Sequence, residues 1–261
     1  MNRLVSALIL TILSAAFSFG QVTISGVNPI QTGFVVVTPL YGGGSGLVVS
    51  ELLSTSLSGN LVQSSVLSSP LVTFTSIVVN FNSNSAVNTA VAIVNPNGGP
   101  AGIALTLRDQ SGGLFGIRNI TVGGEQQLSR FATQLFPRLE SSSEPFQGLL
   151  FISSNVPIGV LGLAFNGSSF ASLPVAAQLN PNGPVEAPFS LVGPSGILLA
   201  QLATGGGWES RITIANTSTS PQIIRIDFFS AAGGPLALPI GTGVPFATVP
   251  AAGVVTFSTV R

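Results

Sequence analysis

The chain has 261 residues and a formal net charge of zero; its 8 Arg and 8 acidic residues make up 6% of it, and it has no Lys, His or Cys. This composition excludes a Ser-His-Asp triad, a thiol nucleophile, a lysine Schiff base, a disulfide and a zinc site with nitrogen or sulfur ligands. Because positive charge is not in excess, we expect no nucleic-acid partner, and no motif indicates a cofactor.

Residues 1–20 have the pattern of a secretory signal peptide. An Arg near the N-terminus precedes a short apolar stretch, and the small residues Ser18 and Gly20 precede a cleavage site before Gln21. A second cleavage position follows Ala16, and an N-terminal membrane anchor is the alternative reading. The apolar stretch is shorter than the ~20 residues that span a bilayer, and no later segment is longer. We therefore expect a secreted or cell-surface protein with no membrane span after signal removal.

Alternating apolar residues predict short strands along the mature chain. Period-two runs bounded by Asn-Pro and Gly-Gly are typical of half-buried strands, and turn signals ~8–12 residues apart are typical of an all-β sandwich or barrel. The main runs are Val91 and Ile93; Ile103, Leu105 and Leu107; Ile212 and Ile214; and Ile224, Ile226 and Phe228. One short helix is predicted over residues 129–136, because Phe131, Leu135 and Phe136 share a side and Pro137 ends it.

An internal repeat appears at an offset of 121 residues, where 89–114 align without a gap on 210–235. The matched residues are Ile93 and Ile214, Asn95 and Asn216, Pro100 and Pro221, Ile103 and Ile224, and Gly112-Gly113 and Gly233-Gly234. After a six-residue insertion, Val122 aligns with Val249. A weaker match places 31–37 on 146–152. Strand and turn keep one register, as in duplicated units.

The repeat predicts the domain organisation. Residues 66–178 form a complete β-sandwich, residues 179–189 form a Pro-rich linker, and residues 22–65 and 190–261 are half modules. The two halves together have 116 residues, against 113 in the complete copy, so we expect 22–65 to complete the sandwich of 190–261.

That completion makes a specific packing prediction. Strands near 33–38 and 46–53 are expected to pack with strands near 211–215 and 223–229 in one chain, because an open half would expose apolar surface and unpaired backbone groups. Exchange of halves between molecules into a head-to-tail fibre is the rival, and a truncated gene is the third account.

Several strand and turn motifs carry a resemblance to a known family. They are Ile93–Pro96, Leu105–Asp109, Arg130–Pro137, Ile152–Ile158, Leu163–Gly167, Gly205–Trp208 and Ile212–Asn216. With them the chain resembles a repeat module of secreted, largely uncharacterised bacterial surface proteins. The resemblance implies an extracellular setting and an immunoglobulin-like antiparallel β-sandwich. Together with the repeat, this predicts two all-β sandwich domains, one of them split between the N- and C-terminal segments. It implies no catalytic residue.

Trp208, which follows three glycines, is the candidate ligand-binding residue. An exposed Trp beside flexible backbone is suited to stacking on a sugar ring, whereas a Trp that covers the end of the sandwich is the alternative. Its counterpart in the repeat is the aliphatic Val87, which favours packing.

Carboxylates are the remaining source of chemistry, since glycoside hydrolysis needs only two of them. The acidic residues are Glu51, Asp109, Glu125, Glu140, Glu144, Glu186, Glu209 and Asp227. Most lie in or beside predicted turns, and Asp109 is expected to initiate one. Glu140 and Glu144 share a Ser-rich loop but do not form a calcium-loop motif, so we expect neither a catalytic nor a metal site.

The leading hypothesis is a non-enzymatic module that displays β-sandwich surfaces for adhesion or extracellular matrix assembly. Its partner would be itself or an extracellular glycan or protein. A carbohydrate-binding module is the alternative, and a carboxylate-based glycoside hydrolase comes third. Few charges and no Lys leave exposed strand edges without the residues that usually prevent edge association.

Overall fold

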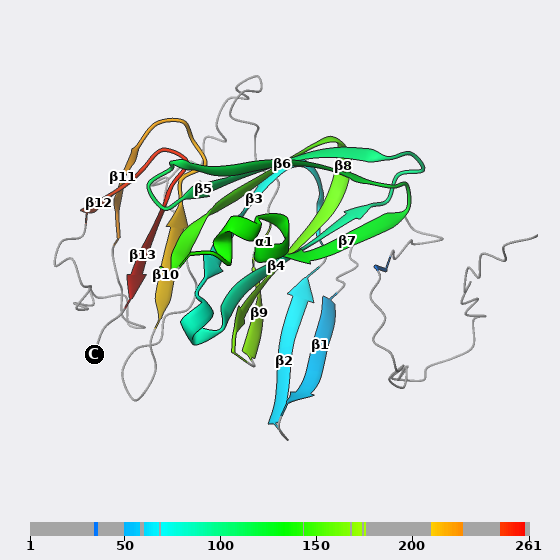
Figure 1. The fold of residues 1–261 in the computed structure, drawn as a ribbon, viewed down its shortest axis with the longest axis horizontal. Helices are drawn as coiled ribbons and strands as arrows, with labels where there is room; N and C mark the ends of the chain where they lie inside the picture. Colours follow the sequence, from blue (N-terminus) through cyan, green and yellow to red (C-terminus); the bar gives the residue numbers. More distant parts are fainter. Residues whose placement is uncertain are drawn as a thin grey trace, which may run out of the picture. The chain divides into compact units, whose positions relative to one another are not determined.

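A computed structural model describes Phe34 and Val35 and residues 50–57, 60–67, 69–142, 144–167, 169–173, 175, 210–226 and 246–258 (Figure 1). All structural statements below concern these residues. The fold is all-β with antiparallel pairing throughout, as the sequence predicts. The strands are β1 Ser50–Leu57, β2 Asn60–Leu67, β3 Leu71–Phe81, β4 Val87–Asn95, β5 Ala101–Asp109, β6 Leu114–Val122, β7 Gln126–Phe131, β8 Phe146–Asn166, β9 Ser169–Leu173, β10 Arg211–Ala215, β11 Gln222–Arg225, β12 Phe246–Val249 and β13 Val254–Ser258.

The 21-residue strand β8 joins two layers of the main sheet. Its first part, 148–154, pairs with β5 on one side and β3 on the other. Its last part, 159–166, pairs with β4, and β9 pairs with the end of the same part. The layers are therefore β6-β5-β8-β3 and β7-β4-β8-β9, and β8 passes from one to the other around Pro157.

The core lies between the residues that alternate inward on these strands. Ile93 on β4 and Ile103 on β5 are 1% and 2% exposed, and Leu105 and Leu107 are fully buried. Their neighbours along each strand are half-buried or exposed, which confirms the predicted period of two. Ile152 of β8 is fully buried in the same cluster.

The helix predicted over 129–136 is wrong for its first three residues. Residues 126–131 form β7, and α1 covers only Ala132–Leu135. All six residues of β7 pair with β4, so tertiary pairing outweighs the local helical pattern. The helix then begins where Gln134 Oε1 accepts a hydrogen bond from the Phe131 amide at 3.0 Å. Arg118 of β6 donates to the carbonyl oxygens of Gln134 and Leu135 at its end.

The described residues also contain two short 3-10 helices. η2, Ser83–Ser85, lies between β3 and β4, and η3, Pro137–Leu139, follows α1. Buried Leu135 of α1 and Leu139 of η3 belong to the core cluster. No helix among the described residues is both long and apolar enough to cross a membrane.

The C-terminal strands form two two-stranded sheets, β10 with β13 and β11 with β12. The turn before β13 contacts the turn after β5, since the Val254 amide donates to the Gln110 carbonyl at 3.1 Å. The β1–β2 hairpin contacts β9, where Ser172 donates from its amide to Ser64 Oγ and from its hydroxyl to the Ser65 carbonyl.

Part of the predicted domain organisation concerns residues outside the described ranges. Residues 1–33 and 176–209 are not described, and they include the predicted signal peptide and the predicted linker. β1 begins within the predicted strand at 46–53 and pairs with β2. The completion of 190–261 by 22–65 stays a prediction.

Candidate functional site

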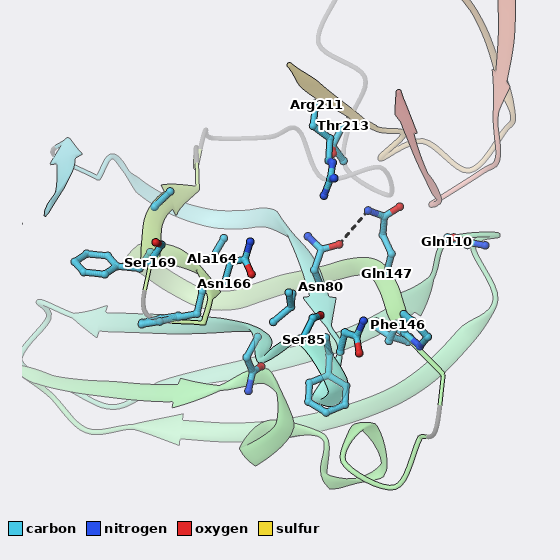
Figure 2. Close-up of a pocket in the computed structure, with 18 residues that line it drawn as sticks. Asn80, Ser85, Gln110, Phe146, Gln147, Ala164, Asn166, Ser169, Arg211 and Thr213 are labelled. Atoms are coloured by element: carbon cyan, nitrogen blue, oxygen red, sulfur yellow. Dashed lines mark hydrogen bonds between the residues drawn. The ribbon is translucent and has the colours of Figure 1, made fainter. Parts of the chain in front are cut away.

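A pocket with a mixed polar and apolar lining and a volume of about 610 Å³ is the candidate ligand site. Residues of β3, β4, β8, β9 and β10 line it, together with residues of the turns after β3, after β5 and before β8. Amides, hydroxyls and aromatic rings dominate, among them Asn80, Gln147, Asn166, Ser169, Phe165 and Phe170. Figure 2 shows Arg211 and Thr213 pointing from β10 toward Asn80 and Gln147.

The amides of this pocket are held in place by hydrogen bonds between strands. Asn80 and Gln147 are direct partners in the pairing of β3 with β8, so their side chains project from the same face. Gln147 Nε2 donates to Asn80 Oδ1 at 3.0 Å, the dashed line in Figure 2. Gln147 Oε1 accepts from Thr256 Oγ1 at 3.2 Å, and Thr256 Oγ1 lies 3.1 Å from Thr213 Oγ1. This chain of side-chain hydrogen bonds therefore links β3, β8, β13 and β10.

Aromatic rings lie beside the amides. Phe165 and Phe170 are partners in the pairing of β8 with β9, and their ring centroids are 5.8 Å apart. The ring centroids of Phe131 and Phe165 are 5.3 Å apart in an edge-to-face arrangement. Rings next to amide donors and acceptors offer an apolar surface and hydrogen bonds together, which suits an uncharged polyhydroxylated ligand.

The carboxylates predicted as candidates do not gather at this pocket. Glu51, Glu125, Glu140 and Glu144 are exposed, and no described residue lining the pocket is Asp or Glu. No group of three His, Cys, Asp or Glu that could hold a metal ion occurs in the described ranges. Trp208, Glu186, Glu209 and Asp227 lie outside those ranges.

Asp109 initiates a turn, as its position before Gly112-Gly113 predicts. Its Oδ1 accepts hydrogen bonds from the Ser111 amide at 2.9 Å, the Ser111 hydroxyl at 2.6 Å and the Gly113 amide at 2.9 Å. Partial burial raises the pKa of Asp109, but these hydrogen bonds outweigh burial and lower the pKa below its ordinary value. The Asp109 carboxylate therefore stabilises the turn between β5 and β6.

Asn95, which the sequence identified only as a turn and repeat residue, is fully buried and joins three segments. Its Nδ2 donates to the carbonyl oxygens of Gly99 at 2.8 Å and of Val122 and Gly123 at 3.0 Å. Its Oδ1 accepts from the amide and the side chain of Asn97. Burial with every polar atom paired indicates a structural residue.

Asn216 is 6% exposed and makes the corresponding contacts. Its Nδ2 donates to the carbonyl oxygens of Ser220, Val249 and Pro250 at 2.8, 3.2 and 2.9 Å. Its Oδ1 accepts from the amide and hydroxyl of Ser218. Each partner stands where the sequence alignment puts it, with the six-residue insertion before Val249.

Comparison with known proteins names no family. No protein-family description matches the chain, and no curated protein matches it. Among solved structures, the Anabaena sensory rhodopsin transducer aligns with 35% of this chain and 95% of its own, at 20% identity and a TM-score of 0.29. A similarity this low carries no argument about fold or function.

Proposed function

We propose that the protein is a non-enzymatic, secreted or cell-surface β-sandwich protein that acts in adhesion or extracellular matrix assembly. The observation that carries the proposal is the edge strand β6. It lies at the end of the seven-stranded sheet, pairs with β5 on one side, and has nine residues. An edge strand of that length is a template for pairing with another chain.

The surface of β6 supports association rather than preventing it. Leu114 and Ile117 are 57% and 63% exposed. The strand has one charged residue, Arg118, and its guanidinium donates to the carbonyl oxygens at the end of α1. Natural edge strands are usually protected by Lys, Pro or inward-pointing charges, and β6 has neither Lys nor Pro.

A charge placed on this edge tests the proposal. Ile117→Lys should weaken self-association and retention at the surface of producing cells by about ten-fold, because a charged side chain on an edge strand opposes pairing with a second edge. Ser141→Lys, which adds the same charge at an exposed turn, is the matched control and should change neither. A strict monomer at all concentrations, together with no retention at cells, would overturn the proposal.

A carbohydrate-binding module is the second candidate, and the amide and aromatic lining of the pocket favours it. The lining has hydrogen-bonding groups but no described carboxylate, so it supports binding over glycoside hydrolysis. Screening against a glycan array tests it. Binding that is lost in both Gln147→Ala and Trp208→Ala, but kept in Asn119→Ala on exposed β6, would favour this candidate.

A further inference from the structure

Strand β6 presents one row of uncharged side chains on the outer face of its sheet. The row consists of Ile117, Asn119 and Thr121, whose partners on β5 alternate with the buried residues of that strand. Ile117 is 63% exposed, and Asn119 and Thr121 are also exposed. We call these three residues the outer row of β6. Their exposure leaves the edge of the strand within reach of a strand of another molecule.

The alternate residues of β6 lie on the face directed toward the core, and they include the strand's one charge. They are Gly116, Arg118, Ile120 and Val122, opposite the buried residues of β5. The Arg118 guanidinium donates to the carbonyl oxygens of Gln134 and Leu135 at 3.0 and 2.8 Å. The arginine is therefore engaged with the end of α1.

The chemistry of this edge fits a second copy of the same chain. The chain has a formal net charge of zero, and charged residues make up 6% of it, so two copies approach without net repulsion. A second β6 also brings the same uncharged outer row. Its β-branched Ile117 and Thr121 are residue types that form favourable cross-strand pairs.

Symmetry restricts the registers in which β6 can pair with itself. Two identical strands that meet by a two-fold axis pair in antiparallel direction, and residues opposite each other point to the same face. A residue of the outer row must therefore lie opposite another residue of the outer row. This condition holds only when the axis passes through a residue of β6 and not between two residues.

Two of these registers conflict with the strand itself. An axis at Arg118 would place two arginines opposite each other, and like charges in that position are destabilising. An axis at Ile117 would place Phe115 within the new ladder. The pairing of β5 with β6 shifts register at Phe115, which is the position of a bulge.

An axis at Asn119 gives the longest regular pairing. It pairs residues 116–122 of both copies, whereas an axis at Ile120 pairs only residues 118–122, because β6 ends at Val122. The register at Asn119 also avoids the bulge and keeps the two arginines from facing each other.

We infer that β6 of one copy pairs with β6 of a second copy, in antiparallel direction and with Asn119 opposite Asn119. Ile117 then lies opposite Thr121, and the two seven-stranded sheets become one continuous sheet. Because both copies use the same patch, the contact is closed and stops at two copies. This inference rests on the proposed function and names the partner and the register of its edge strand.

Cysteine cross-linking tests the register, since the chain has no Cys of its own. Asn119→Cys brings two thiols opposite each other at a Cα separation of about 4.5–5.5 Å, which a disulfide can bridge. This variant should form covalent dimers under mild oxidation. Thr121→Cys, exposed on the same row, is the matched control. Its two cysteines would lie about 13 Å apart along the strands, so it should cross-link at least about ten-fold more slowly.

Sedimentation of the full chain over a range of concentrations tests the closed pair. The mass should rise to that of two copies and then stay constant. Asn119→Asp should raise the dissociation constant by about ten-fold or more, because two carboxylates would lie opposite each other. Asn119 is exposed, so this variant leaves the fold of the single chain intact. Ser141→Asp, which adds the same charge at an exposed turn, is the matched control and should change the constant less than about two-fold.

Three results would overturn the inference. Equal rates of cross-linking for the two cysteine variants would contradict the register. A mass that continues to rise past two copies would contradict the closed pair. A purified chain that is monomeric at all concentrations but is retained at producing cells would identify a partner other than a second copy. In each case the proposed function would stand if Ile117→Lys still abolished association or retention.

Discussion

At the scale of single residues, two buried asparagines hold the turns of the sheets. A buried amide costs free energy unless its donors and acceptor are paired. Asn95 pairs all of them with backbone groups or with Asn97. It therefore fixes the turn after β4 and the end of β6 with one side chain, and Asn216 does the same after β10.

Asn95→Ala should lower the free energy of unfolding by about 3 kcal/mol, because it leaves buried carbonyl and amide groups without partners. Chemical denaturation followed by circular dichroism measures this. Asn119→Ala, at an exposed position of β6, is the control and should stay within about 0.5 kcal/mol of the parent. If Asn95→Ala lowered the free energy of unfolding no more than the control does, water would have replaced the hydrogen bonds of the Asn95 side chain.

Asp109 makes one part of the stability depend on pH. Its pKa is lowered in the folded state, so its contribution is present at neutral pH and is lost as the pH falls below about 4 through the folded value. Asp109→Asn should therefore lower the free energy of unfolding by about 1 kcal/mol at pH 7. The difference from the parent should shrink near pH 2. Urea unfolding at both pH values measures it, and a difference independent of pH would contradict the assignment.

At the scale of elements, β8 determines how the layers meet, and it depends on a close approach of backbones. Gly148 faces the carbonyl oxygen of Arg108 where β8 pairs with β5. Gly148→Ala should thus unfold the sandwich or lower its free energy of unfolding by more than about 3 kcal/mol. Gly98→Ala, whose Cβ would meet no atom within 4 Å, is the matched control. Equal melting temperatures for the two variants would show that β8 shifts to make room.

Sequence periodicity predicts the inward residues of β4 and β5 because half-buried strands alternate strictly. It does not predict β8, whose 21 residues pass through two layers and bury both faces in part, as with Leu149 and Leu150. It also mistakes the last three residues of β7 for helix, because pairing with β4 is not visible in a local pattern. The pocket escapes prediction for the same reason: Asn80 and Gln147 are far apart in sequence and meet through strand pairing.

At the scale of the whole molecule, two similar sets of strands differ in how deeply their apolar side chains are buried. The first set contains β4 and β5, and the second contains β10 and β11. β4 and β5 each lie between two strands, whereas β10 and β11 each have one described partner. Isolated two-stranded sheets are marginally stable in water, so their local opening costs less free energy. The single chain should therefore be held together mainly by the part that contains β8.

Hydrogen exchange of backbone amides should reveal this difference directly. In dilute solution, where copies do not meet, amides of β10 and β11 should exchange about 100-fold faster than amides of β4 and β5, which corresponds to an opening free energy lower by about 3 kcal/mol. Equal protection of the two sets in dilute solution would mean that the C-terminal sheets are completed within one chain.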